Sequence, residues 1–228
     1  MNVVYSISGN YHDYIIPSVK SLVEHNPDVN LFIITETDEV LGLPYDAKVI
    51  NVSNQKLISK HSINYYNRFT YLNLLKVYYP TLLPVDKVLH LDADTIVCEN
   101  LDLLDALYMG DNWVAAVPEI QTWYRPFGDR YYNMGVALIN LEQMRKDNIE
   151  KVMGKYLSDI KQPFADQDAW NKYGIEYGKF IEIPNRYNSS IACGYVWDDP
   201  AIVHLCGYSD WWNNPNIPQQ EYVERYKE

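Results

Sequence analysis

Strand-like and helix-like segments alternate along most of the chain, and this alternation restricts its fold more than any other feature. Apolar runs rich in Val and Ile, typical of buried strands, occur at residues 2–8, 29–35, 47–52 and 87–92. Between the first two runs, apolar residues recur at helical spacing from Ile15 to Val23, and Asn26-Pro27 ends that helix. Such alternation is typical of an α/β fold, in which helices cover the faces of a sheet. We therefore expect a single α/β domain in this chain of 228 residues.

The remaining elements follow the same pattern until the last part of the chain. A helical period runs from Ile63 to Tyr79 and stops at Pro80. Strands are predicted at residues 113–117 and 133–141, and helices at residues 141–160 and 165–173. From Pro184 onward the chain is rich in Asn, Pro, Tyr and Trp, which favours irregular structure there.

Composition argues against several classes of function. The formal net charge of −11 and the lack of a basic patch argue against a nucleic acid as partner, since nucleic-acid binding depends on clustered Lys and Arg. No apolar run approaches the ~20 residues of a membrane-spanning helix, and the first residues lack the basic start of a secretory signal. We therefore expect a cytoplasmic protein. The 21 tyrosines suit sugar binding, but they suit an aromatic-rich core equally well.

Two aspartates stand one residue apart at the end of the strand-like segment "KVLHLDADTIV", residues 87–97. In an extended chain, residues i and i+2 point to the same side, so Asp92 and Asp94 can converge just beyond the strand. Ligand sites of open α/β sheets lie at that edge. Because adjacent carboxylates repel each other, a hard divalent cation is their natural partner. The alternative is a helix N-cap and a solvated turn, since "ENLDLLDAL" can form a short helix directly afterwards.

The aspartate pair by itself is compatible with more than one class of protein. A phosphohydrolase of the haloacid-dehalogenase type also carries D-x-D after an apolar strand, with the first Asp as nucleophile. Its motif, however, usually follows the first strand of the chain and has Thr or Val two residues beyond the second Asp, whereas Thr95 follows Asp94 directly. A catalytically inactive sugar-binding module is a further alternative.

Several separate motifs, in the same order along the chain, resemble those of the retaining glycosyltransferases of family 8, which include bacterial lipooligosaccharide galactosyltransferases and glycogenin. The most characteristic is the D-x-D segment "LDADTIV", and the likeness extends from "VVYSISGNY" to "VHLCGYSDWW", nearly the whole chain. The resemblance implies a GT-A fold, with a Rossmann-like mixed sheet flanked by helices in a single domain, residues 1–228. It also implies a nucleotide-binding half at about residues 1–110 and an acceptor-side half at about residues 111–228.

The resemblance places the nucleotide at the turn after the first strand, "YSISGNY". Ser6, Ser8 and Asn10 would bond to the nucleoside. Tyr11 would stack on uracil, because any aromatic face can do so with a flat base. Lys76 stands where relatives carry Arg or Lys, and it would meet the donor's phosphates or sugar hydroxyls as a point charge. The alternative for Lys76 is an exposed lysine of a helix.

A metal site is implied by the D-x-D segment together with a histidine near the end of the chain. Asp92 and Asp94 would bind the cation, and together with Ala93 between them they would belong to the binding site of the donor. His204, followed by Gly207 in "VHLCGYSDWW", resembles the family's third metal ligand. Carboxylates and imidazole suit Mn²⁺, with Mg²⁺ as the alternative cation. The alternative for His204 is a packed histidine on an apolar strand.

Two more segments resemble parts of the family's site for the donor sugar. In "YYNMGVALINL", Asn133 and Gly135 would line the sugar, and glycine would let the backbone approach it closely. In "ADQDAWN", Asp166, Gln167 and Asp168 would face the anomeric carbon and the sugar hydroxyls. These residues and Lys76 are the catalytic candidates.

Of two further segments, one resembles a structural turn of the family, and the other differs from the family pattern. The segment "IPNRYN", residues 183–188, resembles a family turn that is structural rather than catalytic. Asp210 stands where the family carries a phosphate-binding Lys, and Trp211 stands where it carries Pro. One donor contact is therefore expected to be missing or to come from another residue.

The resemblance implies a metal-dependent retaining transferase that moves glucose or galactose from UDP-glucose or UDP-galactose to a glycan or glycoconjugate. No side chain is an obvious nucleophile: Gln167 is a weak one, and Asp166 or Asp168 could instead stabilise a cationic sugar. A front-face route is therefore favoured, in which the leaving phosphate accepts the acceptor's proton. Because the segment "PQQEYVERYKE" has mixed charge, at most weak membrane association is expected. A homodimer is left open.

Overall fold

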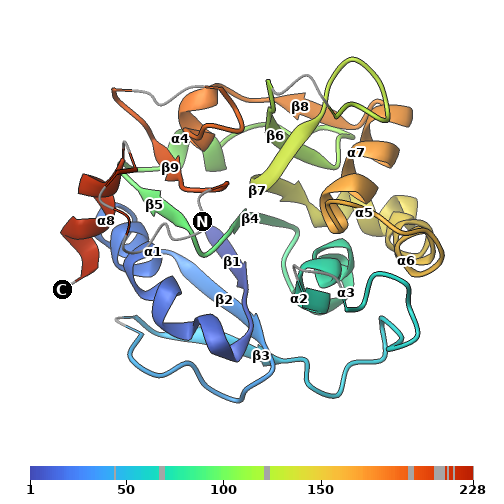
Figure 1. Cartoon of the computed structure of the whole chain (residues 1–228), viewed down its shortest axis with the longest axis horizontal. Coiled ribbons are helices and arrows are strands. Elements are labelled where there is room, and N and C mark those ends of the chain that lie inside the picture. The colour runs from blue at the N-terminus through green and yellow to red at the C-terminus, as the bar shows by residue number, and fades with distance from the viewer. Residues whose placement is uncertain are drawn as a thin grey trace.

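A seven-stranded sheet forms the centre of the protein (Figure 1). The structure is a computed structural model that describes residues 1–43, 45–66, 70–120, 124–194, 198–207, 214, 216–217 and 219–227, with the backbone alone for Asn10 and Lys227. Within these residues the strand order is β3 (Ala47–Asn51), β2 (Asn30–Thr35), β1 (Asn2–Ser6), β4 (Lys87–Leu91), β7 (Tyr132–Asn140), β6 (Val114–Pro118) and β8 (Phe180–Glu182).

The direction of the strands brings several chain segments to one edge of this sheet. β3, β2, β1 and β4 run parallel, whereas β7 runs antiparallel to both β4 and β6. The carboxyl ends of β1, β4 and β6 therefore meet the amino end of β7. Beyond this edge, β5 (Thr95–Val97) pairs with β9 (Ile202–His204) in a small antiparallel sheet. The predicted mixed α/β sheet is confirmed.

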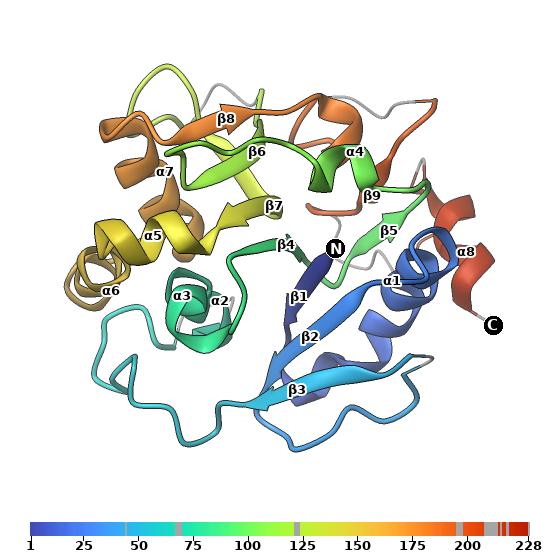
Figure 2. The same cartoon turned by 180° about the vertical axis from the view of Figure 1, so that it is seen from behind.

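Alternating side chains of the central strands fill two hydrophobic cores, one on each face of the sheet. In β1, Val4 packs under the layer of α2 (Thr70–Leu74), α3 (Tyr79–Leu82), α5 (Leu141–Asp147), α6 (Ile149–Asp159) and α7 (Asp166–Glu176). Val3 and Tyr5 pack against α1 (His12–His25) and α4 (Asp102–Asp105). This period of two is what a strand covered on both faces requires. Figure 2 shows α1 on one side and α3, α5 and α6 on the other.

Two helices differ from the sequence prediction. The helix expected from Ile63 to Tyr79 is, within the described residues, divided into α2, a 3₁₀ segment η2 (Leu75–Tyr78) and α3. Pro80 does not end it but lies in the first turn of α3, where the missing N–H of proline costs no hydrogen bond. The helix expected over residues 141–160 is broken at Asn148, whose φ of 51° separates α5 from α6.

The last part of the chain is more regular than predicted. From Pro184 onward, the described residues include η3 (Asn185–Asn188), β9 and α8 (Gln220–Lys227). Val223 of α8 packs with Ile96 of β5 and Val203 of β9 in a separate small core. β9 has three residues, which is too short for a periodic signal in the sequence. Among the described helices, none has the length and apolarity needed to cross a membrane.

Candidate active site

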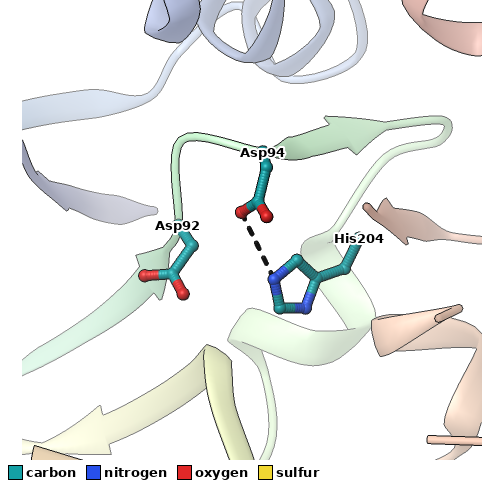
Figure 3. Close-up of side chains that lie close together, drawn as sticks. All are labelled: Asp92, Asp94 and His204. Carbon is teal, nitrogen blue, oxygen red and sulfur yellow. Dashed lines mark ion pairs between the residues drawn. The ribbon is translucent and has the colours of Figure 1, made fainter. Parts of the chain in front are cut away.

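Asp92, Asp94 and His204 surround one point at the edge of the sheet. The two aspartates lie on the turn between β4 and β5 (Figure 3). Because Thr95 pairs with His204, the histidine reaches the same place although it is distant in sequence. His204 Nε2 lies 3.3 Å from Asp94 Oδ1, and ligand atoms of all three residues lie within 4.8 Å of one another. The structure thus brings together the predicted set.

Hydrogen bonds leave one oxygen of Asp92 facing this point. Asp92 Oδ1 accepts from Lys76 Nζ at 2.8 Å and lies 2.9 Å from His90 Nε2. The other ring nitrogen of His90 lies 3.1 Å from the Tyr79 hydroxyl. Burial, and then the charge of Lys76, lower the pKa of His90 to about 4, so the ring is neutral and Nε2–H donates to Asp92. Asp92 Oδ2 is therefore the oxygen left for a ligand.

His204 is held with one nitrogen directed at Asp94. Its Nδ1 lies 2.9 Å from Asn188 Oδ1, and because an amide oxygen can only accept, Nδ1 carries the proton. Nε2 is buried and, among the residues that the structure describes, has no hydrogen-bond partner. Burial by itself lowers the pKa of His204, but the acidic groups of Cys206 and Asp94 outweigh this effect and raise it. Without a cation, a proton on Nε2 would balance Asp94, and a cation would displace it.

This arrangement fits a divalent cation. It offers two carboxylates and the unpartnered nitrogen of a buried imidazole, a donor set suited to Mn²⁺ and, less closely, to Mg²⁺. Gly135 of β7 borders the point from the other side. A Cβ there would lie 2.7 Å from His204 Nε2 and 2.8 Å from Asp92 Oδ2, so only glycine leaves this space open.

A pocket of about 90 Å³ adjoins the cation site and contains most of the predicted donor-sugar residues. It is lined by Asn73, Lys76, Asp92, Met134, Gly135, Phe164, Asp166 and Gln167. Lys76 is only 3% exposed, so the alternative of an exposed helix lysine is wrong. Its Nζ lies 3.9 Å from Asp166 Oδ2 as well as beside Asp92. Burial is the main cause that raises the pKa of Asp166 to about 7.

Gln167 and Asn133 meet at an acidic residue that the sequence prediction missed. Gln167 Nε2 and Asn133 Nδ2 both donate to Glu119 Oε1, at 3.1 and 2.8 Å. Glu119 directly follows β6, whose carboxyl end lies at the same edge as that of β4. That position, an acidic residue just after a buried strand, is the same signal that pointed to Asp92.

Asp168 lies away from the pocket. It is fully buried, and its carboxylate accepts from the hydroxyls of Tyr124 and Tyr131 at 2.9 and 2.8 Å. The backbone N–H of Phe164 donates to its second oxygen at 2.8 Å. These bonds tie the start of α7 to neighbouring segments, next to Ala165 with its φ of 52°. The carboxylate of Asp168 therefore supports the backbone that carries Asp166 and Gln167.

The residues predicted to hold the nucleoside lie on and after β1. Ser6 Oγ donates to the Leu72 carbonyl at 3.0 Å, and the Ser8 carbonyl accepts from Tyr11 N at 2.9 Å in the 3₁₀ turn η1 (Gly9–Tyr11). Tyr11 is 54% exposed, with its ring 5.6 Å from that of Tyr14. This exposed ring can accept a flat partner. The side chain of Asn10, a predicted nucleoside contact, lies outside the described residues.

The other predicted donor residues are divided between the site and the part of the chain that is not described. Ala93 lies between the two aspartates, half-buried. Gly207 follows β9 with a φ of 88°, a conformation that favours glycine. Asp210 and Trp211, where the family pattern is broken, lie outside the described residues.

Comparison with known proteins agrees with this geometry. Residues 2–215 match the model of glycosyl transferase family 8. Glycosyltransferase GlyA of Streptococcus pneumoniae is 26% identical over 97% of this chain, but the match covers only 33% of that protein, so this chain spans about a third of its length. Lipopolysaccharide 1,2-glucosyltransferase of Escherichia coli is 24% identical over 93% of this chain and 73% of its own length.

A solved structure supports the same assignment at the level of the fold. The galactosyltransferase LgtC, in complex with donor and acceptor sugar analogues, superposes with a TM-score of 0.74 at 22% identity. The superposition covers 100% of this chain and 95% of that chain. With the family model matched over almost all its length, the chain belongs to glycosyltransferase family 8.

Proposed function

We propose that the protein is a metal-dependent, retaining hexosyltransferase that moves glucose or galactose from a UDP-sugar to a glycan or glycoconjugate. The observation that carries this proposal is the convergence of Asp92, Asp94 and His204 beside a small polar pocket in a family 8 chain. Its similarity to a lipopolysaccharide glucosyltransferase of Escherichia coli and to a lipopolysaccharide galactosyltransferase of Salmonella typhimurium supports a hexose as the transferred group.

Asp92 Oδ2, an oxygen of Asp94 and His204 Nε2 would hold Mn²⁺, or Mg²⁺ as the alternative. Such a cation supplies positive charge where the departing diphosphate becomes more negative. Lys76 adds a second, permanent charge: burial alone would lower its pKa, but Asp166 and Asp92 raise it, so the ammonium stays protonated. It neutralises the carboxylates under the donor and leaves the cation free to balance the phosphates.

The pocket residues favour a front-face reaction. The Gln167 carbonyl oxygen accepts from the Met134 backbone N–H at 2.9 Å, which further weakens an already weak nucleophile. Asp166 is almost fully buried beside Lys76, and Asp168 is bonded to two tyrosines. With Asp166 paired with Lys76 and Asp168 turned away from the pocket, the leaving phosphate oxygen would accept the proton of the incoming hydroxyl. Gln167 and Asn133 would orient the sugar through their amides.

A donor screen tests this proposal. The purified chain is incubated with MnCl₂ and, separately, UDP-glucose, UDP-galactose and UDP-N-acetylglucosamine, and the release of UDP is followed. We expect hydrolysis of UDP-glucose or UDP-galactose with Mn²⁺ and none in excess EDTA. UDP binding without any turnover, with or without added glycans, would support an inactive sugar-binding module instead. Hydrolysis of a simple phosphate monoester without sugar-nucleotide binding would support a dehalogenase-type phosphohydrolase.

A further inference from the structure

A single carboxylate oxygen of Glu119 connects two amide side chains of the candidate site. Its Oε1 accepts from the amide nitrogen of Gln167 in the pocket and from that of Asn133 on β7. Burial raises the pKa of this carboxyl, while the same two bonds lower it. The residue is half-buried just after β6. Two bonds to one carboxylate oxygen make it an anchor for both amides.

The orientation of both amides follows from backbone donors. The N–H of Met134 donates to Gln167 Oε1 at 2.9 Å, and the N–H of Gly135 donates to Asn133 Oδ1 at 3.0 Å. Because a backbone N–H can only donate, both amide oxygens face β7 and both NH₂ groups face Glu119. An acceptor at position 119 is therefore needed to satisfy them.

A chain of hydrogen bonds continues from Asn133 to the candidate metal ligand. Asn133 Oδ1 also accepts from Asn188 Nδ2 at 2.9 Å, which turns Asn188 Oδ1 toward His204 Nδ1, again at 2.9 Å. This oxygen requires the proton on Nδ1, so Nε2 is the nitrogen that faces Asp94 and that can bind a cation once its own proton is displaced. Asn188 and Asn133 are buried, which keeps water from replacing these bonds.

We propose that Glu119 is a positioning residue: it holds the NH₂ groups of Gln167 and Asn133 in place and, through Asn133 and Asn188, secures the ring tautomer of His204. The inference rests on the proposed function. In that function, one carboxylate supports both the amide that faces the sugar and, through a hydrogen-bonded relay from Glu119 to His204, the imidazole that faces the cation. Partners that orient a metal-bound histidine typically change metal affinity 10–100-fold when removed. Glu119 acts on the metal site at a distance, without itself contacting a ligand atom.

Cation affinity is the readout that separates this role from a purely structural one. Binding of MnCl₂ in the presence of UDP is measured by the electron paramagnetic resonance of free Mn²⁺. Glu119→Met keeps the size of the side chain but removes the acceptor, and we expect about tenfold weaker Mn²⁺ binding. Glu119→Gln still offers an oxygen to both amides, so its affinity should stay within about threefold of the wild type. Glu142→Met, at an exposed site on α5, is the matched control and should be unchanged.

A double variant tests whether the effect passes through the relay. Asn188→Leu should weaken Mn²⁺ binding at least as much as Glu119→Met. If both act through one chain of bonds, the double variant should bind no more weakly than Asn188→Leu alone. Additive losses would overturn the relay. Thermal unfolding confirms that each variant is folded; if Glu119→Met is not, Glu119→Asp, which withdraws the carboxylate by one methylene, replaces it with the same expected loss.

Failure of the inference and failure of the proposed function give different results. A wild type that binds Mn²⁺ and UDP, with Glu119→Met binding Mn²⁺ equally well but transferring poorly, would overturn the inference and assign Glu119 to direct contact with a substrate. A wild type that binds no Mn²⁺ with UDP would overturn the proposed function and the relay with it. Weak binding in Glu119→Met, restored in Glu119→Gln, is the result expected here.

Discussion

Lys76 Nζ lies 2.8 Å from Asp92 Oδ1 and 3.9 Å from Asp166 Oδ2, so one buried ammonium joins two motifs that are far apart in sequence. Asp92 comes from the turn after β4, and Asp166 is the first residue of α7. Burial alone would raise the pKa of Asp92, but Lys76 and His90 lower it well below its usual range. Charge balance in this part of the protein therefore depends on Lys76 as long as no cation is bound.

We expect Lys76→Met to destabilise the protein without its cation by about 3 kcal/mol, the lower end of the range for removing one partner of a buried ion pair. The lower end applies because Asp92 keeps part of its surface in solvent. The measurement is urea unfolding in EDTA. Lys151→Met, at an exposed position of α6, is the control. Equal stability of the two variants would show that Asp166 and Asp92 do not need this counter-charge.

Asp166 should make stability depend on pH. Its folded pKa of about 7 is higher than the unfolded value of 3.8, so between these values the folded state binds more protons than the unfolded state. The stability that Asp166 contributes is then complete below the unfolded pKa and is lost as the pH rises toward 7. In EDTA, the free energy of unfolding of Asp166→Asn should increase relative to the wild type from pH 5 to pH 8. A difference that stays constant over this range would contradict the raised pKa.

The sequence predicted the parts of the site that depend on local geometry. Asp92 and Asp94 follow from the i and i+2 rule at the end of a recognisable strand, and the edge of the sheet follows from the strand pattern. His204, Asn133 and Gln167 came from the family resemblance. Glu119 and the support from Asn188 were not predicted, because their partners are chosen by how β6, β7 and η3 pack. Hydrogen bonds between residues that are so far apart in the sequence produce no periodic pattern in it.

Helix boundaries failed for a related reason. The sequence predicts one polar helix over residues 141–160, but Asn148 adopts a left-handed conformation and a second helix starts after it. Asparagine tolerates this conformation better than most residues, and the buried positions shift by five residues there, from Met144 of α5 to Ile149 of α6. A proline can follow the end of one helix or occupy the first turn of the next, and the sequence around Pro80 does not distinguish these two positions.

Asp94→Asn should abolish transfer and Mn²⁺ binding while leaving the fold intact. Its carboxylate faces His204, whose pKa Asp94 helps to raise, so the imidazole can release its Nε2 proton when that carboxylate is removed. The substitution therefore removes a ligand without leaving a buried charge unpaired. Asp92→Asn should abolish transfer as well, but it also deprives Lys76 of a partner and should be less stable. Transfer assays, Mn²⁺ titration and circular dichroism check this, with the exposed Asp102→Asn of α4 as control. Full activity of Asp94→Asn in EDTA would rule out a metal-dependent reaction.

Tyr11→Ala should weaken UDP binding by roughly 1–3 kcal/mol, the value of one aromatic–base stack. The exposed ring of Tyr11 follows β1, whose carboxyl end lies beside that of β4. Isothermal titration with UDP and MnCl₂ measures the change. Tyr108→Ala is the control: this exposed tyrosine follows α4, which contacts Lys87 at the opposite end of β4. Unchanged affinity in Tyr11→Ala would place the base elsewhere.

Gly135→Ala should remove cation binding because the added methyl group would occupy the point that the ligands share. Its Cβ would lie 2.7 Å from His204 Nε2 and 2.8 Å from Asp92 Oδ2, closer than real Cβ contacts occur. Gly174→Ala is the matched control, since its Cβ would come 2.6 Å from Phe180 Cδ2, between α7 and β8. Both variants should unfold at lower temperature than the wild type, as overpacked sites do. Only Gly135→Ala should lose Mn²⁺ binding, and equal affinities in the two variants would mean that the cation does not lie between Asp92 and His204.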